Sequence, residues 1–408
     1  MNIVCVALHA PPLNDPESFC TARFLSALCQ QGHSVDLITL DHENQLDSDL
    51  VHQLLDPAIN IIKIRHKEIG KLDRCMSSIA NWYRGQHAEF INCAYNESVR
   101  VLRNRINPIL VTRAYPVASN IIGYKLKQKL GITWIAHFSD PYPGFGMYSR
   151  RNIHIKYIDS WWARRILRNA DVISVTCENA LRWFKDYHNT DVKVKWTVTD
   201  HIGDPPLRVS GRIIGSHSDL VFAHVGRLHR QRYVDAIIRE FSDFHQIEGP
   251  TFRLLQFGPV DLGEMYKSPK HRQLPVWFEV LSGQVNSPTD ATIVLDEADV
   301  NVVVDQDDGI ASCPYLASKF AYAVIAGKPI LAIGQKDSAM AQMCAEYKCF
   351  YFADGREKGD ISRVLSEIVR APAEARLIPS DRLKDKFMQQ RVAQGFVEAV
   401  GPIADLQS

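Results

Sequence analysis

Short apolar runs alternate with helical patterns along most of the chain, and this alternation constrains the fold more than any other feature. A run of four to eight apolar residues between turn residues is typical of a strand buried on both faces. Strands that alternate with helices form a parallel sheet covered by helices on both sides. In the first half we predict strands at residues 2–8, 34–40, 61–64, 109–112, 133–137 and 172–175, and helices near 17–31, 86–106, 117–130, 155–168 and 178–187.

The alternation breaks once, in a turn-rich segment at residues 201–219. Its sequence, HIGDPPLRVSGRIIGSHSD, holds two prolines and three glycines, which interrupt helices and strands. Beyond it we predict strands at 220–225, 252–257, 276–281, 300–304, 329–333 and 349–352. We therefore expect an α/β chain of two Rossmann-like doubly wound domains, residues 1–200 and 201–380, followed by a C-terminal helix within 381–408.

The charges balance, and this excludes one class of partner. The chain carries 47 Lys and Arg against 46 Asp and Glu, so no overall field attracts a polyanion such as nucleic acid. Its nine cysteines include no Cys-x-x-Cys pair, and its N-terminal sequence MNIVCVALHAPP lacks the basic region of a signal peptide. No run approaches the roughly 18 apolar residues of a membrane-spanning helix. We expect a cytoplasmic protein without nucleic-acid partners.

The strongest candidate for binding chemistry is a glycine turn with three arginines. The segment Gly226-Arg-Leu-His-Arg-Gln-Arg232 follows a predicted strand and precedes a helix predicted to start near Tyr233. Ligands of doubly wound sheets bind beyond the carboxyl ends of the strands, and a helix N-terminus with nearby arginines suits a pyrophosphate. The alternative is a basic turn that contacts only water.

A second candidate lies at the start of a predicted helix, in the sequence LASKFAYAVIAGKPI. Ser318, Lys319 and Tyr322 are spaced so that they share one face of this helix near its N-terminus. Such a face suits a phosphate or a ribose. The alternative is that Tyr322 is a core aromatic residue and Lys319 a surface charge.

Two further loops contain residues suited to metal or acid-base chemistry. Asp305 and Asp307 follow the predicted strand 300–304 and form either a divalent-metal site for a nucleotide diphosphate or a plain acidic loop. We expect no metal, because no further ligands are evident. His137 and Asp140 end a predicted strand in a loop bounded by prolines, where they serve acid-base chemistry, acceptor binding or only the structure.

Aromatic and basic residues are mixed in the stretch 148–168. This composition is typical of a helix at a membrane interface, so we predict a peripheral membrane contact there. The alternative is a helix that packs against its own domain. The residues concerned are Tyr157, Trp161 and Trp162 among Arg150, Arg151, Lys156, Arg164, Arg165 and Arg168.

Taken in order, these segments resemble the GT-B glycosyltransferases of the group-1, family 4-like type. In the first half the resemblance rests on QQGHSVDLIT, TRAYP, WIAHFSDPY and NADVISVT, and in the second on HVGRLHRQR, LLQFG, LSGQV, EADVNVVV and SKFAYAVIAGKPIL. It runs over nearly the whole chain. A nicotinamide-dependent dehydrogenase would carry Gly-x-Gly-x-x-Gly after the first strand, and this sequence has none there.

The resemblance implies that the first domain binds an acceptor, that the second binds a nucleotide diphosphate-sugar donor, and that the C-terminal helix packs back on the first domain. It assigns Arg227 and Arg232 to the donor diphosphate, whose departure they assist. It places His137 and Asp140 on the acceptor side. The further donor-binding positions are Gly226, Gln284, Val285, Ser318, Lys319 and Tyr322.

The implied reaction is transfer of a hexosyl group to an acceptor hydroxyl, with retention of configuration and without a metal or other cofactor. Such relatives commonly act on glycans or glycolipids in bacterial surface-polysaccharide synthesis, at the inner face of the membrane. The family's pair of glutamates is replaced here by Pro314 and Tyr322. Two alternatives therefore stay open: a scaffold that binds a nucleotide-sugar or a partner without turnover, and a nucleotide-sugar epimerase.

Overall fold

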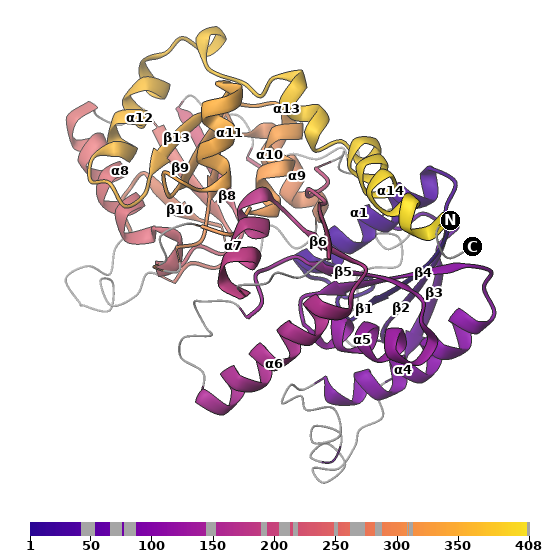
Figure 1. Ribbon diagram of the computed structural model, residues 1–408. Coiled ribbons are helices and arrows are strands. Elements are labelled where there is room, and N and C mark those ends of the chain that lie inside the picture. The colour runs from indigo at the N-terminus through magenta and orange to yellow at the C-terminus, as the bar shows by residue number, and fades with distance from the viewer. Residues whose placement is uncertain are drawn as a thin grey trace. The chain divides into compact units, whose positions relative to one another are not determined.

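The chain divides into two compact units, and each is described by itself (Figure 1). The first unit is Met1–Asp200 together with Gln389–Ser408, and the second is His201–Met388. The computed structural model describes residues 1–41, 54–65, 76, 87–143, 152–188, 194–203, 213–214, 219–248, 252–261, 274–281, 288–307, 309 and 313–405.

Within the described residues, the first unit contains a seven-stranded sheet in which all neighbouring strands are parallel. Its order is β3-β2-β1-β4-β5-β6-β7. The edge strand β7, of sequence KWTV, was not predicted, because its residues are only partly buried and form no apolar run. The strands are β1 (Asn2–Ala7), β2 (Ser34–Leu40), β3 (Asn60–Ile64), β4 (Pro108–Ala114), β5 (Thr133–Phe138), β6 (Val172–Val175) and β7 (Lys195–Val198).

Helices cover both faces of this sheet. Figure 1 shows α4, α5 and α6 on one face and α1 with α14 on the other. The last helix belongs to this unit although the second unit precedes it in the sequence, and the rings of Phe24 in α1 and Phe396 in α14 meet edge to face at 4.9 Å. The helices are α1 (Pro16–Gln30), α4 (Ala88–Arg103), α5 (Ala118–Leu130), α6 (Ile153–Asn169), α7 (Glu178–His188) and α14 (Gln389–Asp405).

The described part of the second unit holds a six-stranded sheet, also parallel throughout, in the order β10-β9-β8-β11-β12-β13. The predicted fold class, two doubly wound α/β domains, is confirmed. The strands are β8 (Leu220–Val225), β9 (Phe252–Phe257), β10 (Phe278–Val280), β11 (Val300–Val304), β12 (Ile330–Gly334) and β13 (Tyr351–Asp354).

The second sheet buries an apolar layer on each face. On one face, Phe222 and Phe252 pack with Phe241 of α8 and with Trp277. On the other, Val221 and neighbouring residues pack with α9. The helices of this unit are α8 (Val234–Glu248), α9 (Pro288–Glu297), α10 (Ser318–Ala326), α11 (Ala339–Tyr347), α12 (Asp360–Arg370) and α13 (Asp381–Lys386), with a short 3-10 turn η1 (Arg230–Arg232) before α8.

The strand order reverses once in each sheet. The chain moves outward from β1 to β2 and β3, and then returns to place β4 on the other side of β1. In the same way, β8 is followed by β9 and β10 before β11 takes the place on its other side. Helices that leave neighbouring strands in opposite directions leave a crevice at their carboxyl ends, and ligands of such sheets bind there. Binding residues are therefore expected in the segments after β1, β4, β8 and β11.

Replacement of Gly123 tests the packing between α5 and the sheet of the first unit. A Cβ atom at Gly123 would lie 2.3 Å from Nε1 of Trp134, an atom that already donates to Oγ1 of Thr112 at 2.8 Å. We expect Gly123→Ala to destabilise the protein by about 1–3 kcal/mol, the usual cost of overpacking a core.

The matched control is another helical glycine, the exposed Gly395 in α14, where an added Cβ atom would meet nothing within 4 Å. Gly395→Ala should stabilise by up to about 1 kcal/mol because alanine favours the helix. Thermal unfolding followed by circular dichroism measures both variants. Equal melting temperatures for Gly123→Ala and wild type would contradict the close packing.

Candidate functional site

A tight turn follows β8 and can be built only from glycine. Gly226 has a φ of +119° and donates its N–H to the carbonyl of Phe257 at 2.7 Å. Gly258, after β9, has a φ of +125°, and a Cβ atom there would lie 2.7 Å from the carbonyl oxygen of Gly226. Larger residues do not fit this close approach. The turn leads to the exposed Arg227.

Lys319, from the first turn of α10, lies against this turn. A Cβ atom at Gly226 would be 2.3 Å from its Nζ. The structure therefore brings together the two segments that the sequence marked as separate candidates. Arg227, Lys319 and the N-terminus of α10 all lie at the carboxyl edge of the sheet. The strand order reverses there, between β8 and β11.

Arg232 and Asp305 lie at the carboxyl end of the neighbouring strand β11. Arg232, at the end of η1, donates from Nη1 to the carbonyl of Val304 at 3.1 Å. Asp305 follows β11, is almost fully buried, and accepts the N–H of Ala317 at 3.4 Å. Burial raises the pKa of Asp305 to about 7, although the charge of Arg232 opposes the shift. Near neutral pH, much of this carboxyl is therefore uncharged.

His224 is a buried histidine of β8 near Lys319 and Arg232. Its Nδ1 shares a hydrogen bond with Gln256 at 2.7 Å. Burial, together with the charges of Lys319 and Arg232, lowers the pKa of His224 to about 3. The imidazole therefore stays neutral while two cations remain beside it. A region with this excess of positive charge suits an anionic ligand.

The remaining predicted residues of the second unit take different places. Tyr322 is partly buried and packs with the apolar layer that includes Val221, and Ser318 is the first residue of α10. Asp307 accepts two hydrogen bonds from Arg356, at 2.6 and 2.9 Å. No group of three or more potential metal ligands occurs among the described residues. Gln284 and Val285 lie outside the described residues.

In the first unit, His137 lies in β5, one residue before the end of the strand. Its side chain is buried, and Nδ1 shares a hydrogen bond with Oγ of Ser174 in β6 at 2.9 Å. Asp140 is exposed two residues beyond the end of β5. The structure thus separates the two: His137 belongs to the interior of the sheet, and Asp140 to the surface at its carboxyl edge.

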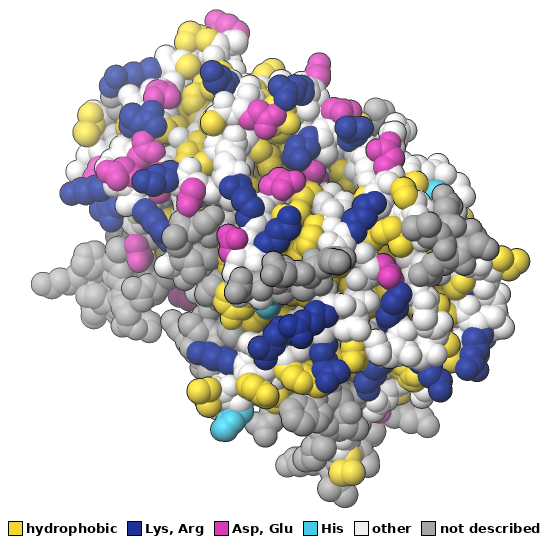
Figure 2. All heavy atoms as spheres, viewed as in Figure 1, with side chains coloured by type: hydrophobic (Ala, Val, Ile, Leu, Met, Phe, Trp, Pro, Cys, Tyr) yellow, Lys and Arg dark blue, Asp and Glu magenta, His cyan; other side chains and the backbone are white. Residues whose placement is uncertain are grey.

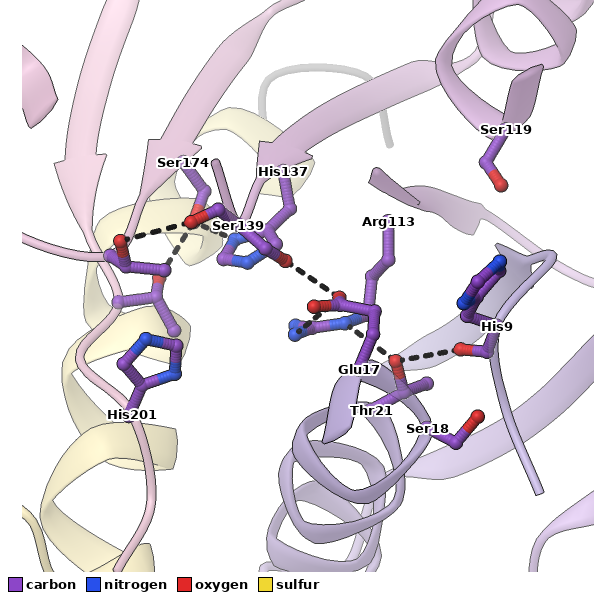
Figure 3. A network of polar contacts seen from close by, with 12 residues as sticks. His9, Glu17, Ser18, Thr21, Arg113, Ser119, His137, Ser139, Ser174 and His201 are labelled. Atoms are coloured by element: carbon purple, nitrogen blue, oxygen red, sulfur yellow. Dashed lines mark hydrogen bonds and ion pairs between the residues drawn. The ribbon is translucent and has the colours of Figure 1, made fainter. Parts of the chain in front are cut away.

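A buried ion pair that was not predicted from the sequence lies at this edge (Figure 3). Glu17, in the first turn of α1, faces Arg113 at the end of β4 at 3.6 Å and accepts the hydroxyl of Ser139 at 2.6 Å. Arg113 also donates to Oγ1 of Thr21 at 3.1 Å. Burial raises the pKa of Glu17 to about 7, against the opposing charge of Arg113. The sequence feature that could have indicated Glu17 is its position beside Pro16, at the start of the first helix.

A second unpredicted pair joins His9, after β1, to Asp15, the N-cap residue of α1. The distance from Nδ1 of His9 to Oδ2 of Asp15 is 2.5 Å. Oδ1 of Asp15 accepts the N–H of Ser18 at 2.7 Å. Burial raises the pKa of Asp15, but the bonds from His9 and Ser18 outweigh it, and the net pKa is lowered. The sequence signal was a histidine directly after the first strand, followed by Asp-Pro.

Comparison with known proteins identifies the architecture. No family model and no curated protein sequence matches the chain. Sucrose-phosphate synthase from Thermosynechococcus elongatus matches over 100% of both chains, with a TM-score of 0.69 and 14% identity. A trehalose-6-phosphate structure from E. coli, bound with UDP-2-fluoro glucose, matches over 100% of this chain and 99% of that one, with a TM-score of 0.62 and 11% identity. WaaG, a glycosyltransferase involved in lipopolysaccharide biosynthesis, matches over 99% of each chain, with a TM-score of 0.58 and 12% identity.

The chain has the GT-B fold. The resemblance to GT-B glycosyltransferases seen in the sequence is thereby confirmed at the level of the fold, with full coverage. These structural neighbours include a protein called a glycosyltransferase, WaaG, and a structure bound with UDP-2-fluoro glucose. In the GT-B chain described here, the positive crevice lies in the second unit, and the Glu17–Arg113 and His9–Asp15 pairs lie in the first.

The raised pKa of Glu17 gives the stability of this GT-B chain a specific pH dependence. The folded state binds more protons at Glu17 than the unfolded state between about pH 4.5 and 7. Its contribution to stability is therefore full at low pH and lost as the pH rises through 7. Glu17→Gln removes this loss. The free energy of unfolding of the variant, relative to that of wild type, should therefore rise by about 2 kcal/mol from pH 5 to pH 8.

Melting temperatures of wild type and Glu17→Gln at pH 5, 6, 7 and 8 measure this gain. About 2 kcal/mol corresponds to roughly 4–8 °C for a unit of this size. At each pH the melting temperature of wild type is subtracted from that of the variant. Only the change of this difference with pH is used, so an effect of the substitution that is the same at every pH cancels. A difference in melting temperature that does not change with pH would show that Glu17 is ionised throughout.

Proposed function

We propose that this chain is a glycosyltransferase that moves a hexosyl group from a nucleotide diphosphate-sugar to an acceptor hydroxyl. One observation carries the proposal: Lys319 lies against the Gly226 turn, and Arg232 donates to the carbonyl of Val304 at the end of the neighbouring strand β11, at the reversal point of the second sheet. A diphosphate has the charge and size to occupy such a crevice. The GT-B neighbours supply the reaction class.

The proposed chemistry stabilises the leaving diphosphate. Negative charge on it grows as the bond to the sugar breaks, and preorganised donors stabilise that charge most in the transition state. Arg227, Arg232 and Lys319 would supply the positive charge, and Ser318 the N-terminus of α10. With these groups the reaction needs no metal or other cofactor. Tyr322 and the segment with Gln284 and Val285 would complete the nucleotide site.

The two units would divide the substrates. Residues 201–380 would bind the donor, and residues 1–200, with the returning helix of 381–408, would bind the acceptor near Asp140. We propose a glycan or glycolipid acceptor in bacterial surface-polysaccharide synthesis, in keeping with the neighbour WaaG. The resemblance implies retention, but the residues that replace the two glutamates, Pro314 and Tyr322, leave the stereochemistry to be measured.

Two other functions fit the same fold. A non-catalytic scaffold is favoured by Pro314 and Tyr322, and an epimerase would use the same donor site. Incubation with radiolabelled nucleotide-sugars and a membrane lipid extract separates the three. Lipid-soluble label supports transfer, a new nucleotide-sugar supports epimerisation, and binding without either product supports a scaffold.

Replacement of the crevice arginines tests the role proposed for them. Arg232→Ala and Arg227→Ala should each lower kcat by about 10²- to 10³-fold, the usual cost of one lost donor to a developing anion. The control is Arg363→Ala, an exposed arginine on α12, which should leave kcat within about twofold of wild type, since surface substitutions of this kind are usually close to neutral.

The assay is run in EDTA on variants whose fold is checked by circular dichroism. A near-native kcat in Arg232→Ala would contradict the proposed role of this residue at the leaving diphosphate. Loss of wild-type activity in EDTA, restored by manganese or magnesium, would contradict the metal-free reaction and make Asp305 and Asp307 candidate ligands.

The proposed membrane contact rests on α6. Arg164, Arg165 and Arg168 are exposed there, and Figure 2 shows Lys and Arg side chains gathered over this helix with hydrophobic ones nearby. Tyr157 is also exposed. Trp162, in contrast, is buried, so only part of the aromatic set faces solvent. None of the described helices is long and apolar enough to span a bilayer.

Vesicle flotation tests this surface. Wild type should float with phosphatidylglycerol vesicles at low salt and leave them at high salt, because each basic residue near an anionic surface contributes about 1 kcal/mol. Reversing two charges, in Arg164→Glu/Arg168→Glu, should weaken binding by about 10²-fold or more. The matched control reverses Arg363 and Arg370 on α12 and should float as wild type does. Wild type that stays with the soluble fraction would favour a soluble acceptor.

A further inference from the structure

One buried carboxyl group connects the two segments that carry positive charge at the carboxyl edge of the second sheet. Asp305 directly follows β11, and Arg232 donates to the carbonyl of Val304, the residue before it, at 3.1 Å. Oδ1 of Asp305 accepts the N–H of Ala317, the N-cap residue of α10, at 3.4 Å. Alanine cannot cap a helix with its side chain, so Asp305 supplies the acceptor from the end of β11. It therefore holds the start of the helix that carries Lys319.

The other oxygen of this carboxyl group lacks a hydrogen-bond donor. Oδ2 of Asp305 is buried and accepts no hydrogen bond from any residue that the structure describes. It lies beside Gly334, at the end of β12, where an added Cβ atom would be 3.2 Å from Oδ2 and 3.2 Å from Oγ of Ser338. The glycine leaves room for the carboxyl group and has no side chain to donate to it. Burial without donors costs much more free energy for an ionised carboxylate than for a protonated carboxyl group.

Charged and titratable groups lie around Asp305 on several elements. Burial raises the pKa of Asp305 to about 7, and the charge of Arg232, in η1, opposes the shift. Asp307 accepts hydrogen bonds from Arg356, which follows β13, and these lower its pKa, so that it is ionised at neutral pH. Burial raises the pKa of the Tyr233 phenol, which stays neutral. Among these groups, Asp305 is the one whose charge changes near pH 7.

Three histidines and a thiol complete the surroundings. His224, in β8, is neutral because its pKa is lowered to about 3. His229 precedes η1, and Nε2 of His201 shares a hydrogen bond with the carbonyl of Leu316, before α10, at 3.2 Å. Cys313 is buried in the segment between β11 and α10. A histidine ordinarily titrates close to neutral pH, so a test of Asp305 has to separate it from His229 and His201.

We propose that Asp305 is a positioning residue of the donor site and takes up a proton when the nucleotide diphosphate-sugar binds. This role rests on the function proposed above and adds a proton to its binding step. The neutral carboxyl group holds the start of α10 and leaves the charge of Arg232 to the diphosphate. An ionised carboxylate would place negative charge beside that arginine and oppose a second anion. The proton passes from water to Oδ2, and no bond of the nucleotide-sugar changes.

The direction of the pH dependence follows from this linkage. A bound diphosphate disfavours the carboxylate, so protonation and binding strengthen each other. Below about pH 7 most of the free protein already carries the proton at Asp305, and the affinity for the nucleotide-sugar is at its maximum. Above pH 7 the free protein has to gain the proton in order to bind. Kd should therefore rise with pH, by at most about tenfold per pH unit for one linked proton.

Binding of UDP-glucose to the full chain, in EDTA and without an acceptor, measures this linkage. Both phosphates of UDP-glucose are esterified, so the charge of its diphosphate is constant from pH 5.5 to 8.5. The Kd of wild type should rise by about fivefold or more from pH 6.5 to 8.5. Calorimetry in two buffers of different ionisation enthalpy counts the protons. Wild type should take up about half a proton or more per UDP-glucose at pH 7.5.

Two variants separate the charge of Asp305 from its contact with α10. Asp305→Asn keeps an acceptor for the N–H of Ala317 and is neutral at every pH. Its Kd should lie within about threefold of wild type at pH 6, stay constant with pH and involve no proton uptake. Asp305→Ala removes the acceptor as well, so it should bind about threefold or more weakly than wild type at pH 6, again without pH dependence. Circular dichroism checks the fold of both.

The matched control is Glu240 of α8, a second buried carboxyl group at the start of a helix. Its two oxygens accept the N–H groups of Gly359 and Ser362, at 3.0 and 3.1 Å. Both oxygens therefore have a hydrogen-bond donor, unlike those of Asp305. Glu240→Gln should keep the wild-type pH dependence of Kd and the wild-type proton uptake.

Two results would overturn the role of Asp305. The first is a wild-type Kd that stays constant from pH 6.5 to 8.5, without proton uptake. The second is a rise of Kd that persists in Asp305→Asn; its loss in His229→Gln or His201→Gln would then identify the histidine that titrates. Failure of the proposed function gives a different result, because wild type would then bind neither UDP-glucose nor the other nucleotide-sugars of the radiolabel screen at any pH.

Discussion

A parallel sheet has to be covered on both faces, and this requirement determines where the chemistry of the chain can lie. Every strand pairing in the two described sheets is parallel, so the connections cross the faces of the sheets, as the helices α1, α5 and α8 do. Residues of the strands are therefore buried in the core, between the helices on the two faces. Polar groups gather instead where the chain leaves the strands, after β1 and β4 in one unit and after β8 and β11 in the other.

The carboxyl edges of the two sheets differ in their charges. In the second unit, burial keeps His224 neutral and Asp305 largely uncharged near Arg232, so positive charge is in excess there. In the first unit, each of two carboxyl groups is paired: Asp15 has His9 and Ser18, and Glu17 has Arg113 and Ser139.

The fold was predictable from the sequence because buried parallel strands appear as continuous apolar runs, and only the part-exposed β7 was missed. The glycine turn was predictable for a local reason, since Gly226 and its arginines are neighbours in the sequence. The ion pair of Glu17 with Arg113 was not, because the two residues are far apart in the sequence and only the reversal of strand order brings them together. His137 illustrates the converse: the sequence correctly placed it at the end of a strand, but it did not show that the ring is buried against β6.

The assignment of α14 to the first unit has a consequence for how the protein is made. Its Phe396 completes the apolar contact of α1 through Phe24, yet it is synthesised after the whole of residues 201–388. On the ribosome the second unit can finish folding while the first still exposes the α1 surface. The first unit then completes its folding after the second, which is the reverse of the usual order of domain folding during translation.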